Sequence, residues 1–264
     1  MTRFNLAASN IAWSECDDER VLQRMAELGY TGLEIAPTKI VPEDPYQHVQ
    51  EAKAYLDSVQ GKYGIKVCSM QSIWRGQSGN IFVAEEAERL LAYTASMMDY
   101  AEAIDCPNLV FGCPVNRSVP AGDSPEDAHG FFEACGNMAA AHFTTFSLEA
   151  NPTIYHTNFL NTTDEACRFL RSMPFNTGLA INLDLGTVVQ NDEQVESLIS
   201  IIPLVNHVHI SEPYLAAVTR RSEHEVLRDI LIESRYRGYV SLEMGEADFA
   251  TVNACLEYMA EVFR

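Results

Sequence analysis

Short runs of β-branched and apolar residues alternate along this chain with longer stretches in which apolar residues recur at helical spacing. Eight of the short runs are predicted to be strands, and each has the length of a buried strand. They span residues 4–9, 32–36, 65–71, 108–113, 146–151, 179–185, 205–211 and 239–244.

Apolar positions three and four residues apart predict helices between these strands. Their apolar faces consist of Val21, Leu22, Met25 and Leu28; of Leu90, Thr94, Met97, Ala101 and Ile104; and of Val195, Leu198, Ile199 and Ile202. Residues 123–126 and 162–165 have the pattern of helix starts, and Gly29, Gly61 and Gly64 that of helix ends. The segment 37–47 contains three prolines and is predicted to be a loop.

Eight strands, each followed by a helix at intervals of roughly 30 residues, predict a closed (β/α)₈ TIM barrel, an α/β fold of about 250 residues. An open doubly wound sheet is the alternative, but it usually carries a G-x-G-x-x-G motif after its first strand. No such motif follows residues 4–9, and no linker interrupts the chain. We therefore predict a single domain over residues 1–264.

Composition narrows the classes of function. With 47% hydrophobic and 21% charged residues the chain has enough apolar side chains for a core, which excludes disorder as its main state. A net charge of −19 repels phosphate backbones and argues against a nucleic-acid partner. No apolar run is long enough to span a membrane, no leader precedes the first strand, and the seven cysteines form no C-x-x-C pair. We expect a cytoplasmic protein with reduced thiols and no membrane partner.

Four polar residues stand late in otherwise apolar strands, where a TIM barrel places its active site. They are Glu149, Asp184, His209 and Glu243, on the last four predicted strands. Three carboxylates meeting one imidazole in an apolar barrel mouth require a neutralising cation. Oxygen ligands with one nitrogen suit Mn²⁺, our first choice, and also Mg²⁺, Co²⁺ or Zn²⁺. His207 points to the same side of its strand as His209, so alternation alone does not choose between them.

These residues lie in segments that resemble the xylose isomerase-like TIM-barrel superfamily of sugar phosphate isomerases and epimerases, especially its ketose 3-epimerase and hydroxypyruvate isomerase branches. The similar segments are 28–35, 147–152, 158–162, 182–184, 207–212 and 241–243. The resemblance implies one divalent metal ion bound by Glu149, Asp184, His209 and Glu243. It also implies an isomerase of carbohydrate metabolism that forms dimers or tetramers. Glu149 and Glu243 would then be the catalytic residues, carrying a proton to and from a small sugar through an enediolate.

The chain departs from the ketose 3-epimerase pattern at three substrate positions. A histidine, an arginine and a glutamate of that pattern are replaced by Thr187, Leu215 and Tyr155. The ketose specificity is therefore not transferred. A metal-dependent dehydratase or lyase acting on a polyol and a non-catalytic sugar-binding barrel remain alternatives. Repair endonucleases of the superfamily need extra histidines after strands 2 and 3, and residues 34–37 and 69–72 contain none.

Further polar and aromatic residues near strand ends are candidates for substrate binding, although each also has a structural explanation. They are Glu34, Gln71, Asn151 and Glu212 for sugar hydroxyls, Trp13 and Trp74 for stacking on a sugar ring, and Arg117, Arg220 and Arg221 for an anionic group. Cys113 is interpreted as a core or wall residue rather than a nucleophile because no histidine is placed to activate it.

Overall fold

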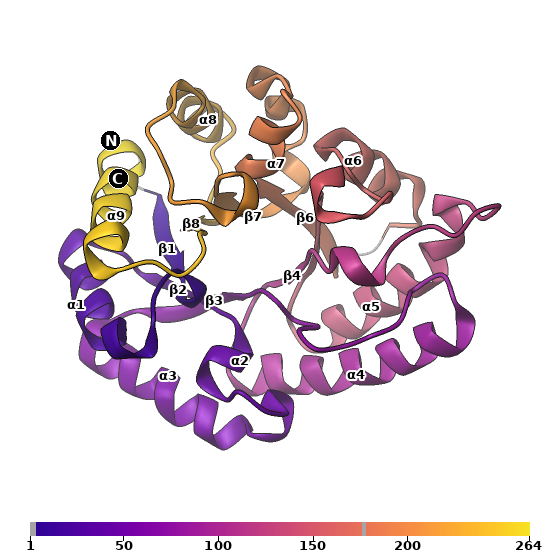
Figure 1. Cartoon of the computed structure of the whole chain (residues 1–264), viewed down its shortest axis with the longest axis horizontal. Helices are drawn as coiled ribbons and strands as arrows, with labels where there is room; N and C mark the ends of the chain where they lie inside the picture. The colour runs from indigo at the N-terminus through magenta and orange to yellow at the C-terminus, as the bar shows by residue number, and fades with distance from the viewer. Residues whose placement is uncertain (1–3, 176–177) are drawn as a thin grey trace.

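The computed structural model describes residues 4–175 and 178–264, and in these residues eight parallel strands form a closed barrel in chain order (Figure 1). The strands are β1 (Asn5–Ser9), β2 (Gly32–Ile35), β3 (Lys66–Met70), β4 (Leu109–Phe111), β5 (Phe146–Glu149), β6 (Leu179–Asp184), β7 (Val205–Ile210) and β8 (Tyr239–Leu242). β8 pairs with β1 from Asn5 opposite Tyr239 to Ala8 opposite Leu242, and this pairing closes the ring. The predicted TIM barrel is confirmed.

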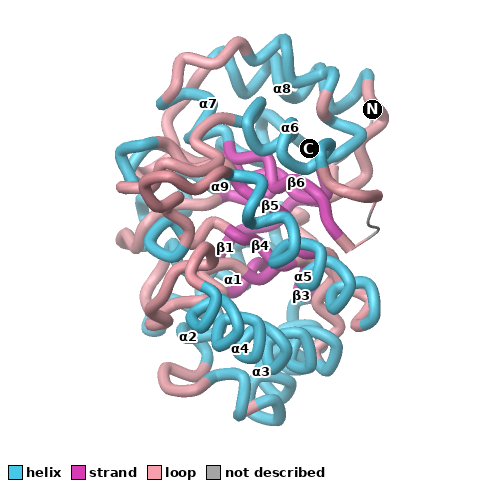
Figure 2. Tube along the Cα trace, turned by 90° about the vertical axis from the view of Figure 1, so that its right-hand side faces the viewer, coloured by secondary structure: helices cyan, strands magenta, loops and turns pink. Residues whose placement is uncertain are grey.

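Helices surround the barrel and cover the outer faces of the strands (Figure 2). They are α1 (Asp18–Leu28), α2 (Pro37–Ile40), α3 (Val49–Tyr63), α4 (Ala84–Ala103), α5 (His129–Ala141), α6 (Thr163–Ser172), α7 (Leu185–Gln190), α8 (Ser222–Glu233) and α9 (Phe249–Phe263). α9 packs against α1 and β1, so the last helix closes the outer layer as β8 closes the inner one. No helix in the described part of the chain is long and apolar enough to cross a membrane.

Seven of the eight strands end one or two residues earlier than the apolar runs predict, whereas β1 ends at Ser9 as predicted. Glu149 and Asp184 are the last residues of β5 and β6, and His209 is the penultimate residue of β7. Glu243 directly follows β8 and stays attached to the sheet through its backbone N–H, which donates to the carbonyl oxygen of Ile210 (3.0 Å). The four candidate ligands therefore share one rim of the barrel.

Helix ends agree with their sequence signals in most places. Thr162 and Glu165 form a capping box at the start of α6. Gly29 (φ 82°) and Gly64 (φ 71°) terminate α1 and α3 in the left-handed conformation. Gly61 does not end a helix, however, since it lies inside α3 and the helix continues to Tyr63.

Two other local predictions are wrong. The predicted loop 37–47 contains α2, which starts at Pro37, and a 3₁₀ turn over Pro45–Gln47, because proline fits the first position of a helix. The helix predicted around Val195–Ile202 is a 3₁₀ segment, Val195–Ser200, followed by a second 3₁₀ turn that contains Pro203. Pro203 lacks the N–H that would continue an α-helix, and Ile199 is left 39% exposed.

Candidate metal centre and pocket

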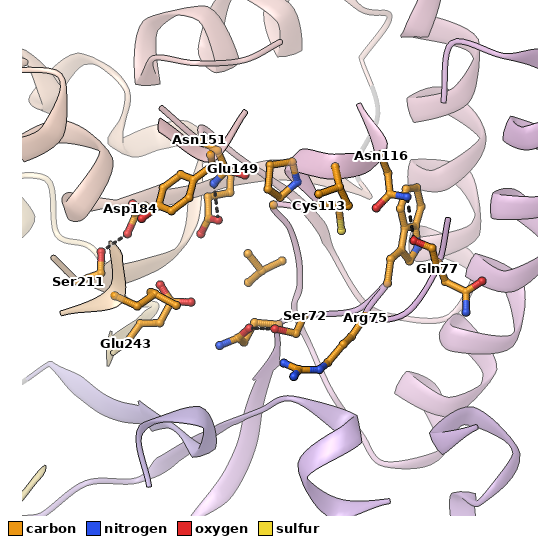
Figure 3. Close-up of a pocket in the computed structure, with 18 of the residues that line it drawn as sticks. Ser72, Arg75, Gln77, Cys113, Asn116, Glu149, Asn151, Asp184, Ser211 and Glu243 are labelled. Carbon is orange, nitrogen blue, oxygen red and sulfur yellow. Dashed lines mark hydrogen bonds between the residues drawn. The ribbon is translucent and has the colours of Figure 1, made fainter. Parts of the chain in front are cut away.

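The structure brings Glu149, Asp184, His209 and Glu243 together at the carboxyl end of the barrel. One ligand atom from each of the four lies within 4.8 Å of all the others. The Nδ1 atom of His209 is 3.1 Å from Glu149 Oε1 and 3.1 Å from Glu243 Oε2. His209 is fully buried, and the carboxylates are the members of the cluster that reach the pocket in Figure 3.

Glu34 fixes the orientation of His209 from the side away from the pocket. Its Oε2 atom lies 2.9 Å from His209 Nε2 and 3.0 Å from His207 Nε2. A carboxylate at Nε2 favours the tautomer with its proton there and leaves Nδ1 facing the three acids. Glu34 is fully buried and is not among the residues that line the pocket, so the predicted contact with sugar hydroxyls is replaced by a positioning role.

Charge in this cluster is out of balance. Burial raises the pKa of the Asp184 carboxyl, with the Glu149 charge adding to the shift. Burial also raises the pKa of Glu243 to about 7, although His209 opposes this shift. Desolvation of His209 lowers its pKa, but Glu243 and Glu34 outweigh that effect and raise it well above the usual value. One imidazole thus faces more negative charge than it can neutralise.

The geometry fits a divalent cation. Mg²⁺ and ions of similar size hold oxygen and nitrogen ligands at about 2.0–2.2 Å, so ligands on opposite sides of such an ion stand roughly 4 Å apart. The 4.8 Å limit that encloses the four ligand atoms is compatible with that spacing. Three carboxylate oxygens and one nitrogen form a hard donor set, and no cysteine belongs to the group.

Two side-chain amides hold the carboxylate of Glu149 in place, and a glycine leaves space for it. Asn182 Nδ2 donates to Glu149 Oε1 (2.7 Å), and Asn151 Nδ2 donates to Glu149 Oε2 (3.1 Å). A Cβ atom on Gly112 would lie only 2.8 Å from Glu149 Oε2, so the carboxylate occupies space that any larger residue at this position would take.

Asp184 is held by two hydroxyl side chains. Its Oδ2 atom accepts bonds from the backbone N–H and the hydroxyl of Thr187 (both 2.7 Å), and the hydroxyl of Ser211 donates to Oδ1. Thr187, which replaces a histidine of the ketose 3-epimerase pattern, is 1% exposed and does not line the pocket. Its role is to orient a candidate ligand.

The open space beside the cluster is a pocket of about 340 Å³, a volume suited to a small molecule. The predicted contacts Gln71, Asn151 and Glu212 line it, as do Tyr155 and Leu215. Glu212 is already paired, because Arg221 Nη2 lies 2.6 Å from its Oε2. Gln71 Nε2 donates to Ser9 Oγ (3.1 Å).

Trp13 and Arg117 do not reach this pocket. Trp13 is buried in the loop that follows β1, and its indole N–H donates to Asp18 Oδ1 (2.8 Å). Arg117 is fully buried and donates to the carbonyl oxygens of Glu149 (2.8 Å) and Leu160 (3.3 Å), which supports the end of β5. Both predicted substrate contacts are therefore structural residues here. Arg220 pairs with Glu261 outside the pocket, and Trp74 lines the pocket with its indole N–H bonded to Thr94.

Sequence reasoning missed Asn182 and Ser211, and a signal for both was available. Asn182 stands two residues before Asp184, and Ser211 stands two residues after His209. Alternation along a strand points such pairs to the same side, so each partner of a predicted ligand was a candidate. In the turn 72–77, which also lines the pocket, the sequence indicated only Trp74, and no comparable signal marked Arg75 or Gln77.

The closed parallel barrel and the cluster of three carboxylates and one histidine together define a TIM-barrel protein with a candidate metal centre at the carboxyl end of its strands. The family model described as xylose isomerase-like TIM barrel matches residues 22–258, and the chain belongs to this family. No curated protein matched the chain.

Solved structures share the fold at low sequence identity. A 3-keto-D-glucoside 4-epimerase from E. coli is 18% identical with a TM-score of 0.75, covering 98% of this chain and 99% of that one. A D-psicose 3-epimerase from Clostridium cellulolyticum H10, solved with D-tagatose, is 16% identical with a TM-score of 0.78, covering 99% and 100%. A family 2 AP endonuclease from Brucella melitensis is 16% identical with a TM-score of 0.74, covering 99% and 100%.

Proposed function

We propose that this protein is a divalent-metal-dependent isomerase or epimerase of a small ketose, sugar acid or sugar phosphate. The observation that carries the proposal is the pair Glu149 and Glu243, two buried carboxylates on either side of His209 Nδ1 that both line the pocket. The sugar epimerases among the similar structures support the same class of reaction.

Glu149, Asp184, His209 and Glu243 would hold the cation, with Mn²⁺ as first choice and Mg²⁺, Co²⁺ or Zn²⁺ as alternatives. When bound, such an ion polarises a carbonyl group and stabilises the negative charge of an enediolate. The protein supplies the rest: Asn182 and Asn151 fix Glu149, Thr187 and Ser211 fix Asp184, and Glu34 fixes His209.

Glu149 and Glu243 are the proton carriers in this proposal. They come from β5 and from the residue after β8, so they approach a bound sugar from different sides. One carboxylate removes a proton from the carbon next to the carbonyl group. Return of a proton by the other carboxylate to the opposite face inverts that carbon, whereas return to the adjacent carbon isomerises the sugar.

Deuterium exchange tests the proposal. We expect the Mn²⁺-loaded protein to introduce solvent deuterium at the carbon beside the carbonyl group of a ketose, a keto sugar acid or a ketose phosphate, as measured by NMR. Glu149→Gln and Glu243→Gln should each slow this exchange by roughly 10²–10⁴-fold, because a general base is lost. Glu196→Gln, at an exposed position outside the pocket, is the matched control.

Three outcomes would contradict the proposal. A deoxy or unsaturated product would indicate a dehydratase or lyase, and sugar binding without exchange would indicate a non-catalytic barrel. Exchange that persists in both glutamine variants would remove Glu149 and Glu243 from the chemistry.

A further inference from the structure

Arg75 is the only basic residue that lines the pocket among residues 4–175 and 178–264. Its side chain is exposed, and no ion pair, hydrogen bond or ring contact engages its guanidinium within the described chain. The arginines singled out from the sequence are all engaged elsewhere: Arg117 with backbone carbonyls, Arg220 with Glu261 and Arg221 with Glu212. In a chain of net charge −19, an unpaired guanidinium on the wall of a pocket calls for an anionic partner.

The turn that carries Arg75 is firmly held. The N–H of Arg75 donates to the carbonyl oxygen of Ser72 (3.0 Å), and Asn116 Nδ2 donates to that of Gln77 (3.1 Å). Between them the buried Trp74 bonds to Thr94 Oγ1 (3.1 Å) and packs edge-on against Phe111 at 5.1 Å between ring centroids. Because the backbone of this turn is fixed, the only part of the turn that binding must order is the Arg75 side chain.

The distribution of charge gives the pocket two different ends. Figure 3 shows Glu149, Asp184 and Glu243 on one side and Arg75, Gln77 and Asn116 on the other. An anionic group is repelled by the carboxylates. Two other arginines are already engaged, Arg117 with the carbonyl oxygen of Glu149 and Arg221 with Glu212. The Arg75 side is therefore the place in the pocket where a negative charge is stabilised.

We propose that the substrate is an anionic sugar whose carboxylate or phosphate pairs with Arg75, while its carbonyl end faces Glu149 and Glu243. This inference rests on the proposed function, since it names the substrate class of the same pocket. A bidentate pair with the guanidinium would select the charged sugar and fix which end meets the cluster. Carboxylate and phosphate share this chemistry, and the experiment separates them.

Calorimetric titration of the Mn²⁺-loaded protein with three sugars of one carbon skeleton tests the inference. D-fructose, D-fructuronate and D-fructose 6-phosphate differ only in a hydroxyl, a carboxylate or a phosphate at the terminal carbon. We expect one of the two anionic sugars to bind about 10- to 100-fold more tightly than D-fructose, as charge-assisted hydrogen bonds predict. Arg75→Gln should bring that ratio close to one, and Arg75→Lys should keep part of it.

Arg237→Gln removes the same charge from an exposed position before β8, outside the pocket, and should keep the full ratio. The inference is overturned if neither anionic sugar binds more tightly than D-fructose, if neither binds at all, or if the preference survives in Arg75→Gln. Deuterium exchange reports separately on the proposed function. Tighter binding of an anionic sugar without deuterium exchange would leave Arg75 as an anion site and reject the isomerase. Deuterium exchange without tighter binding of an anionic sugar would support the isomerase and reject the role of Arg75.

Discussion

His209 is the residue through which the candidate centre is organised. Its Nε2 atom faces Glu34 and its Nδ1 atom faces Glu149 and Glu243. One imidazole ring therefore contacts the buried Glu34 on one side and the two glutamates that line the pocket on the other. The neighbouring His207 contacts only Glu34 among these acids. The two histidines are equivalent in the sequence pattern, and their different surroundings explain why only His209 joins the four-residue cluster.

Gly112 offers a direct test of how closely the pocket is fitted around Glu149. In Gly112→Ala the new methyl group would lie 2.8 Å from Glu149 Oε2 and would displace the carboxylate. We expect at least a roughly 10-fold loss of deuterium exchange with little change in melting temperature, since small misplacements of catalytic groups are costly.

Gly130→Ala is the matched control for this substitution. Gly130 lies in α5, nothing stands within 4 Å of its added Cβ, and alanine favours a helix by about 1 kcal/mol. This variant should keep full exchange and gain slightly in stability. Equal activity of the two alanine variants would show that Glu149 does not need its present position.

Single site residues could be predicted from the sequence where they lie at the carboxyl end of a strand. Glu149, Asp184, His209 and Glu243 were predictable because parallel strands bring their carboxyl ends to one rim. Glu34 was predicted to contact sugar, but its direction, away from the pocket and toward two imidazoles, depends on packing between β2 and β7 that no local pattern encodes. Arg117 looked available because sequence does not show that the chain folds over it.

At the level of elements, the end of β5 is supported by a buried cation. Arg117 donates to the carbonyl oxygens of Glu149 and Leu160, and burial lowers its pKa to about 10. We expect Arg117→Gln to reduce the free energy of unfolding by about 2 kcal/mol, because buried acceptors lose their donors. Chemical denaturation measures this loss.

Arg228→Gln, in which a partly exposed arginine beside Asp229 is replaced, is the control and should change stability by less than about 1 kcal/mol. An Arg117→Gln protein of unchanged stability but weakened binding of anionic sugars would restore Arg117 as a substrate contact. It would then count against the structural role assigned here.

α8 and α9 meet at a buried histidine that predicts pH-dependent stability. His224 Nδ1 lies 2.7 Å from the hydroxyl of Tyr258, and burial lowers the pKa of His224 to about 4. The charged groups acting on it are Glu212, Arg221 and Glu223. The histidine of the unfolded chain binds a proton near pH 6.5, whereas His224 in the folded chain does so only near pH 4. The contribution of neutral His224 to the free energy of unfolding is therefore complete above pH 6.5 and is lost as the pH falls toward 4.

The expected loss is about 3 kcal/mol. Urea unfolding of the wild type and of His224→Gln at pH 4 to 7 measures it, with the carboxylates common to both proteins cancelling in the difference. The wild type should lose more stability than the variant on acidification. Parallel pH curves for the two proteins would mean that His224 titrates normally in the fold.

Element order and barrel closure followed from the sequence because strand length, helix period and their alternation are local signals. Prolines marked the places where these signals failed. Pro37 starts a short helix in a segment predicted as a loop, and Pro203 interrupts a segment predicted as a helix. Proline limits the local conformation without choosing between a turn and a helix start, so packing decides.

On the scale of the whole molecule, the fold gathers negative charge at the carboxyl rim of the barrel. The net charge of −19 opposes the approach of anions, and the pocket has one unpaired cation among its described lining residues, Arg75. A divalent ion at the rim and a guanidinium across the pocket would together give an acidic protein a site for an anionic sugar. Association of subunits and a cytoplasmic location stay predictions.

The metal centre itself can be tested by titrating the metal-free protein with Mn²⁺ and by measuring anomalous scattering from crystals soaked in the same ion. We predict one ion per chain, surrounded by Glu149, Asp184, His209 Nδ1 and Glu243, and an affinity at least roughly 100-fold lower in Asp184→Asn. Absence of an anomalous peak at this cluster under excess Mn²⁺, or Mn²⁺ binding unchanged in Asp184→Asn, would contradict a metal centre formed by these four residues.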